Sequence, residues 1–224
     1  MKNIKVALVT EAGNGLGIKF ASILGDAGYK TIIAAESQSL EVMNKEDIGD
    51  IEIVEVDLTK KESVVKIYAY IKTYFGQLDV LVNNAEIGTG FGQKIEALNI
   101  REMKQLYDEN FFSVISLVQT LLPLLKKSEN SNIINITSPM GDIDNMEDDN
   151  FVYANYQMTA YATAKAALNM YTVLQAREFQ STNIGISGFD PIRMKNCTHN
   201  DVQLCTAVKK EFLELLEQKK VPIS

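Results

Sequence analysis

The sequence has few of the residues that build disulfide frameworks and metal sites. Its two cysteines, Cys197 and Cys205, lie on either side of the single histidine, His199. These three residues are too few ligands for a typical metal site, and a chain of 224 residues is long enough to bury a core without cross-links. We therefore predict no metal and interpret the cysteines as structural or incidental.

Long apolar runs and clustered basic residues are also missing. No stretch approaches the roughly 20 apolar residues that span a bilayer, and the apolar run near the start leads into a glycine turn rather than a signal cleavage site. The formal net charge of −7 argues against a nucleic-acid partner, which requires clustered lysine and arginine. We expect a cytoplasmic globular protein with no membrane partner and a single domain over residues 1–224.

The sequence does contain a regular alternation of elements. Helical patterns separate short apolar runs rich in β-branched residues, which are Ile4 to Val9, Thr31 to Ala35, Ile51 to Val56, Leu78 to Val82, Ile133 to Thr137 and Ile184 to Phe189. Such strands are typical of a parallel sheet covered on both faces. The sequence predicts an α/β, doubly wound parallel sheet, the Rossmann fold. Two long helices, about Asn110 to Lys127 and Met158 to Gln180, are apolar enough to bury a partner subunit as well.

Polar signals follow several of these strands. The segment TEAGNGLG, Thr10 to Gly17, joins the first strand to the first helix. Its glycines would let the backbone approach a dinucleotide whose phosphates meet the helix N-terminus, although such turns also occur for structural reasons alone. Asp57 and Asn83 end the third and fourth strands, at the sheet edge where ligands bind in such folds. Each of these two could equally be a turn residue that caps a strand.

The segment YATAK contains the residues with the clearest chemistry. Tyr161 and Lys165 are four residues apart, so they share a helix face, and the ammonium would favour the ionised phenol. A tyrosine in that setting can donate or accept a proton near neutral pH. Ser138, just beyond the fifth strand, could hold a carbonyl oxygen while hydride arrives from a nicotinamide. Tyr68 and Lys72 repeat the spacing without a polar strand end upstream, and we assign them no chemistry.

With NITSPMGDIDN before YATAKAALNM, nearly the whole chain resembles the short-chain dehydrogenase/reductase family, and in particular its C-factor-like branch. The resemblance implies that Tyr161 is the catalytic acid/base and that Lys165 tunes it and binds the nicotinamide ribose. Ser138 would orient the substrate carbonyl, and Asn110 would help to hold a proton-relay water. Beside Tyr161 and Lys165, the implied cofactor contacts are Thr10, Gly15, Leu16, Gly17, Asp57, Leu58, Asn83 and Ala85. The resemblance also implies NAD or NADP, a small-molecule carbonyl or alcohol substrate, and a homodimer or homotetramer formed through the two long helices.

The sequence departs from the family pattern on the cofactor side. Glu11 replaces the first glycine of TGxxxGxG, and Glu86 replaces the last glycine of NNAG, which puts carboxylates near an anionic cofactor. After the sixth strand, Asp190 stands where the family has glycine. Glu36 ends the second strand where NADP-dependent members often carry arginine, which disfavours NADP.

Two functions therefore remain open. One is an NAD(P)-dependent oxidoreductase that transfers hydride between a nicotinamide and a carbonyl or alcohol. The other is a reductase-like pseudoenzyme with weak or no dinucleotide binding that acts as a binding or regulatory protein. The catalytic residues favour the first, and the cofactor-side departures favour the second.

Overall fold

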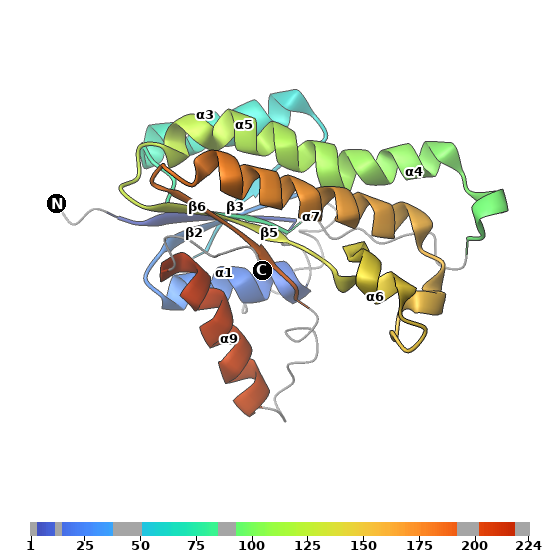
Figure 1. The fold of residues 1–224 in the computed structure, drawn as a ribbon. Helices are drawn as coiled ribbons and strands as arrows, with labels where there is room; N and C mark the ends of the chain where they lie inside the picture. Colours follow the sequence, from blue (N-terminus) through green and yellow to red (C-terminus); the bar gives the residue numbers. More distant parts are fainter. Residues whose placement is uncertain (1–3, 12–14, 38–50, 85–92, 192–201, 218–224) are drawn as a thin grey trace.

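Six parallel strands form the sheet of the protein (Figure 1). The structure, a computed structural model, describes residues 4–11, 15–37, 51–84, 93–191 and 202–217. The strands are β1 (Val6–Thr10), β2 (Lys30–Ala35), β3 (Glu52–Glu55), β4 (Val80–Asn83), β5 (Ser131–Ile136) and β6 (Ile184–Phe189). Their order is β3-β2-β1-β4-β5-β6, and every neighbouring pair is parallel. The predicted doubly wound α/β class is confirmed, and each predicted apolar run overlaps an observed strand.

Helices cover both faces of this sheet. They are α1 (Gly15–Asp26), α3 (Lys61–Tyr74), α4 (Ile100–Tyr107), α5 (Ser113–Leu125), α6 (Ile143–Glu147), α7 (Thr159–Phe179) and α9 (Val202–Glu217). Figure 1 shows α3, α5 and α7 on one face and α1 and α9 on the other. Successive strand residues therefore enter different cores: Leu81 packs in the core below α3 and α5, whereas Val82 packs with α1 and α9. None of the described helices is long and apolar enough to cross a membrane.

The first long helix differs from its prediction. The sequence suggested a start near Asn110, but α4 already begins at Ile100, after Asn99 has capped it by accepting hydrogen bonds from the N–H groups of Arg101 and Glu102. A π-helical turn, Asp108–Phe112, then joins α4 to α5. The helical stretch is longer than predicted because α4 is mostly polar and lacks the apolar pattern that located α5.

At the amino end of the sheet, the buried carboxylate of Asp79 connects three strands. Its Oδ2 accepts a hydrogen bond from the Val6 N–H at 2.7 Å, and its Oδ1 accepts one from the Ser128 hydroxyl at 2.6 Å. The Asp79 carbonyl accepts from the Asn132 N–H at 2.8 Å. One residue thus joins the starts of β1, β4 and β5.

Asp79→Ala should lower the free energy of unfolding by about 2–3 kcal/mol, because the Val6 N–H and the Ser128 hydroxyl would lose a charged, buried acceptor. Urea unfolding of the two proteins measures this difference. The matched control is Asp149→Ala at an exposed position, which should change stability by less than about 0.5 kcal/mol. Equal effects of the two substitutions would contradict the role of Asp79.

Candidate active site

The ends of β1 and β4 are joined at the carboxyl edge, where the strand order changes direction. The Asn84 N–H donates a hydrogen bond to the Thr10 hydroxyl at 3.0 Å, and that hydroxyl donates to the Val82 carbonyl at 3.4 Å. The Asn84 side chain also donates to the Glu11 carbonyl at 3.2 Å. In open α/β sheets, ligands bind at this kind of switch point. Thr10 is buried, so its side chain supports this edge of the sheet rather than lying on the surface.

The described part of the glycine turn leaves room at the start of α1. A Cβ built on Gly15 would meet no atom within 4 Å, so the backbone there borders open space. The next two residues, Leu16 and Gly17, are buried, and Leu16 packs in the core below α1. The N-terminus of a helix bordering open space is suited to an anionic group.

Glu11 adopts a backbone conformation that favours glycine. Its φ is +49°, in the left-handed region where a side chain costs roughly 1 kcal/mol or more. Burial raises the pKa of its carboxyl to about 7, and repulsion from three other carboxylates adds to this effect, namely Glu36, Glu109 and Asp57. A strained, partly buried acid therefore stands in the turn after β1.

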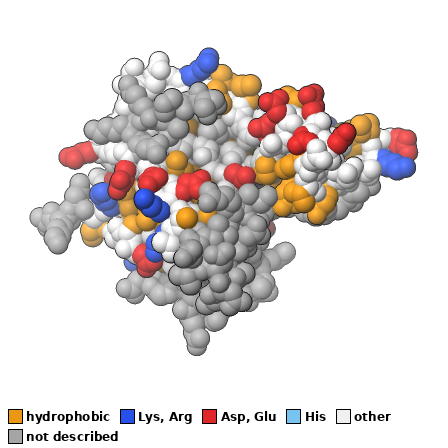
Figure 2. Space-filling view, turned by 60° about the horizontal axis from the view of Figure 1, so that its bottom comes forward, with side chains coloured by type: hydrophobic (Ala, Val, Ile, Leu, Met, Phe, Trp, Pro, Cys, Tyr) orange, Lys and Arg blue, Asp and Glu red, His pale blue; other side chains and the backbone are white. Residues whose placement is uncertain are grey.

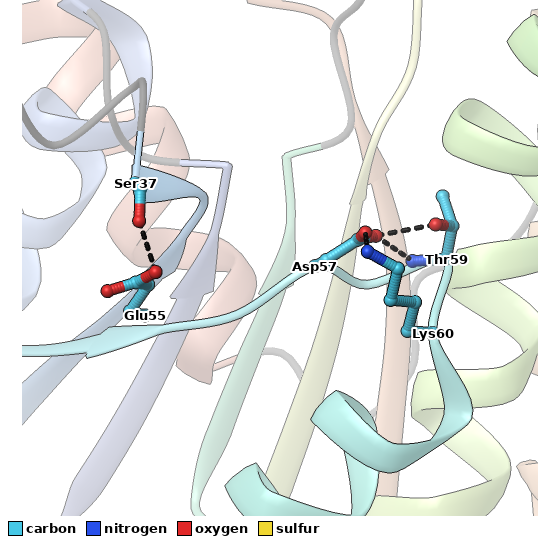
Figure 3. A network of polar contacts seen from close by, with 5 residues as sticks. All are labelled: Ser37, Glu55, Asp57, Thr59 and Lys60. Carbon is cyan, nitrogen blue, oxygen red and sulfur yellow. Dashed lines mark hydrogen bonds and ion pairs between the residues drawn. The ribbon is translucent and has the colours of Figure 1, made fainter.

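A second polar network lies at the ends of β2 and β3 (Figure 3). Asp57 accepts hydrogen bonds from the Thr59 N–H at 3.0 Å and the Thr59 hydroxyl at 2.5 Å, and it pairs with Lys60 at 2.8 Å. Desolvation opposes ionisation, but the bonds from Lys60 and Thr59 lower the pKa of Asp57 overall. Beside them the Ser37 hydroxyl donates to Glu55. The carboxylate of Asp57 therefore organises the turn before α3, which is the strand-cap alternative considered for it.

Two predicted cofactor residues are largely covered. Leu58 packs in the core with α3. Asn83 is fully buried, and its amide donates to the side chain of Asn135 at 2.8 Å, which in turn donates to Thr172 and Gln175 on α7. The Asn83 side chain thus connects β4 and β5 to α7 rather than lying open at the edge.

Tyr161 and Lys165 lie together on α7, as their spacing predicts. The Lys165 Nζ is 5.7 Å from the centroid of the Tyr161 ring and donates a hydrogen bond to the Ile136 carbonyl at 3.0 Å. Lys165 is fully buried, and Tyr161 is 7% exposed. The carbonyl at the end of β5 therefore holds the ammonium beside the phenol ring, where its charge favours the ionised form.

The turn after β5 brings Ser138 to the same helix. Ser138 caps a short 3-10 helix, Pro139–Gly141, by accepting a hydrogen bond from the Met140 N–H. A Cβ on Gly141 would lie 2.6 Å from the carbonyl carbon of Lys165, so only glycine permits this approach. Gly141 was not predicted, although a glycine three residues after the serine was a usable signal.

Asn110 lies fully buried within the π-helical turn between α4 and α5. Its amide donates to the Leu106 carbonyl at 3.0 Å. Such turns occur frequently at functional sites because they redirect a side chain without ending the helix. The preceding residue, Glu109, was also missed, and only the fold brings it near Glu11.

Some predicted residues cannot be placed. Ala85, Glu86, Cys197 and His199 lie outside the described residues. Asp190 is exposed directly after β6.

Acidic side chains gather near α6, toward the right of the face that carries α1 and α9 (Figure 2). The exposed acids of this segment are Asp142, Asp144, Glu147, Asp148 and Asp149. Their charge is the opposite of what binding a polyanion requires.

This combination of a parallel sheet with a tyrosine-lysine pair beside a serine turn is that of a dinucleotide-dependent reductase fold. The family model described as short chain dehydrogenase matches residues 5–204, and the chain belongs to this family.

Curated relatives agree with this membership. An uncharacterised oxidoreductase of Staphylococcus aureus (strain MW2) is 27% identical over 189 residues, which are 84% of this chain and 77% of the relative. A short-chain dehydrogenase of Penicillium roqueforti (strain FM164) is 28% identical over 190 residues, 80% of this chain and 74% of that protein.

Solved structures show the same fold. The NADPH-bound carbonyl reductase from chicken fatty liver has a TM-score of 0.79 at 23% identity, with 96% of this chain and 92% of that chain covered. The 3-ketoacyl-(acyl-carrier-protein) reductase from Brucella melitensis, complexed with NADH, has a TM-score of 0.73 at 24% identity, with 84% and 75% covered.

Glu11→Gln should stabilise the protein at alkaline pH and not at acid pH. In the folded chain the pKa of Glu11 is raised from its ordinary value of 4.5 to about 7, so wild-type stability falls as pH rises from about 4.5 through about 7. Glutamine does not ionise, and the difference in unfolding free energy should grow to on the order of 2 kcal/mol at about pH 8.

Urea unfolding at several pH values measures this difference, with the exposed Glu147→Gln on α6 as the matched control. A stability difference that is the same at all pH values would show that the charge of Glu11 is not responsible.

Proposed function

We propose that this protein is an NAD-dependent oxidoreductase that interconverts a small-molecule carbonyl and its alcohol. The observation that supports this most strongly is the placement of the buried Lys165 ammonium, held by the Ile136 carbonyl at 3.0 Å and lying 5.7 Å from the Tyr161 ring centroid. A buried lysine beside a tyrosine has little structural purpose, because desolvation of the ammonium is costly.

Each catalytic side chain has a role that follows from its position. The Tyr161 hydroxyl gives a proton to the substrate oxygen during reduction and takes it back during oxidation, and Lys165 favours the ionised phenol between these steps. Ser138 donates a hydrogen bond to the same oxygen. Asn110 supports the path by which the proton is replaced from solvent. The nicotinamide, when bound, supplies or accepts the hydride.

The edge of the sheet suits a dinucleotide in part. Gly15 borders open space at the start of α1, and Tyr161 and Lys165 lie at the end of β5 where a nicotinamide ribose would be held. Glu11 is the exception, because its ionised carboxylate would repel a pyrophosphate. These residues therefore fit the cofactor when Glu11 is neutral.

NAD fits better than NADP. Glu36 is exposed at the end of β2, and desolvation together with repulsion from Asp57 and Glu109 raises the pKa of its carboxyl. Among the described residues, Lys60 is the cation that opposes this effect, and it is paired with Asp57. A 2′-phosphate would therefore meet carboxylates with no free partner among the groups acting on Glu36.

Exposed apolar residues on the long helices support a homodimer or homotetramer. They include Phe112 at the end of the π-helical turn and Met170 and Leu174 on α7, each more than half exposed. The C-factor-like branch, the single domain over residues 1–224 and the cytoplasmic location stay predictions of the sequence.

A second function is favoured by one observation, the strained acid at position 11. In that case the protein is a pseudoenzyme that binds dinucleotide weakly or not at all and acts as a binding or regulatory protein. Glu11→Gly together with Glu86→Gly should then raise the affinity for the cofactor. Unchanged affinity would show that the two glutamates are not the cause of the weak dinucleotide binding.

Calorimetric titration of the ligand-stripped protein with NADH and with NADPH tests the proposal. NADH should bind at least about tenfold more tightly than NADPH. Glu36→Gln should reduce this difference in affinity, because it removes a charge near the 2′-phosphate. Binding of neither dinucleotide at any pH would overturn the proposal in favour of the pseudoenzyme.

Tyr161→Phe should reduce turnover of NADH with a panel of small aldehydes and ketones by at least about 100-fold, because it removes the proton donor. The circular dichroism spectrum should not change. Tyr68→Phe on α3 is the matched control, since Tyr68 has the same spacing to a lysine, and its turnover should equal that of the wild type. Unchanged turnover in Tyr161→Phe would remove Tyr161 from the mechanism.

A further inference from the structure

The backbone of Glu11 is anchored on both sides at the carboxyl edge of the sheet. Its N–H donates to the Ala34 carbonyl on β2 at 2.8 Å, and its own carbonyl accepts from the Asn84 amide at 3.2 Å. The φ of +49° between these bonds sets the direction in which the side chain leaves the turn. Relief by a local backbone shift would break a contact with β2 or with the end of β4.

Among the described residues, the charged groups that act on this side chain come from three neighbouring segments and are acidic. Glu36 lies at the end of β2, Asp57 follows β3, and Glu109 lies in the π-helical turn. Lys60, the nearby cation of the β3 end, is ion-paired with Asp57 at 2.8 Å and is not among the groups that act on Glu11. Together with burial, these carboxylates raise the pKa of Glu11 to about 7, so near neutral pH both protonation states are populated.

A bound dinucleotide would add two phosphate charges at the start of α1, next to this turn. Ionised Glu11 would repel them, and the repulsion is strong because the carboxylate is partly buried. The neutral acid removes that repulsion and has an O–H group that can donate a hydrogen bond. Binding therefore favours the protonated form.

We propose that this chain takes up one proton at the Glu11 carboxylate when it binds its dinucleotide, so that cofactor affinity falls as pH rises above neutrality. The proton comes from solvent and returns to it when the dinucleotide leaves. This inference rests on the proposed function, since it concerns the same cofactor site. It explains how the candidate catalytic residues can coexist with an acid in the glycine turn. The cofactor site binds dinucleotide at neutral and acid pH and loses affinity for it at alkaline pH.

The test is calorimetric titration of the full chain with NADH between about pH 6 and pH 9, at each pH in two buffers of different ionisation enthalpy. Wild-type affinity should fall about tenfold for each pH unit above about 7, and proton uptake should approach one per NADH near the alkaline end. Glu11→Gln should bind NADH with an affinity that hardly changes with pH and with uptake near zero. Glu147→Gln, on exposed α6, should keep the wild-type slope.

The possible failures are distinguishable. If wild type and Glu11→Gln bind NADH with the same pH dependence, the inference is overturned and the proposed function stands. If neither protein binds NADH at any pH, the proposed function itself fails. Glu11→Gly, which suits the positive φ, replaces the glutamine variant if that variant is misfolded by thermal melting, and it should also lose the pH slope.

Discussion

The site of this protein depends on the hydrogen bond between the Asn84 N–H and the Thr10 hydroxyl at the carboxyl edge of the sheet. In the sheet, β2 and β3 lie on one side of β1, and β4, β5 and β6 lie on the other side. The crossovers therefore diverge at β1 and β4, and the helices that follow these strands leave a space between them. The buried bond keeps the two strand ends together, so the turn at Glu11 and the end of β4 face one site.

The catalytic side depends on a second constraint, the close approach of the turn after β5 to α7. Gly141 allows the backbone of this turn to touch Lys165, and the Ile136 carbonyl just before the turn accepts the Lys165 ammonium. Helix, turn and strand are thus held together at the candidate catalytic residues. Further along α7, the chain of amides from Asn83 through Asn135 to Gln175 holds the helix against β4 and β5. The result is a rigid catalytic side, which general acid-base chemistry requires.

Much of this arrangement is predictable from local patterns. The strands follow from apolar runs, because parallel strands are buried on both faces, and Tyr161 and Lys165 share a face because of helical geometry. The start of α4 and the π-helical turn at Asn110 were not predictable, since a polar helix shows no core-facing pattern. Asp57 and Asn83 lie near the strand ends where the sequence located them, but their partners, Lys60 and Asn135, were not predicted. Such pairings depend on where separate segments meet.

The sequence alone indicated the class of fold, the family and the candidate catalytic residues, because each depends on periodicity or on short-range spacing. It also located Glu11 and Glu36 as departures from the family. Only the tertiary structure decided what these acids do. Glu11, Glu36, Asp57 and Glu109 are distant along the chain, and the parallel sheet and the π-helical turn bring them to one edge, where burial and repulsion between carboxylates raise the pKa values of Glu11 and Glu36. Electrostatic energy depends on separation in space and on exposure to water, and neither is a local property of the sequence.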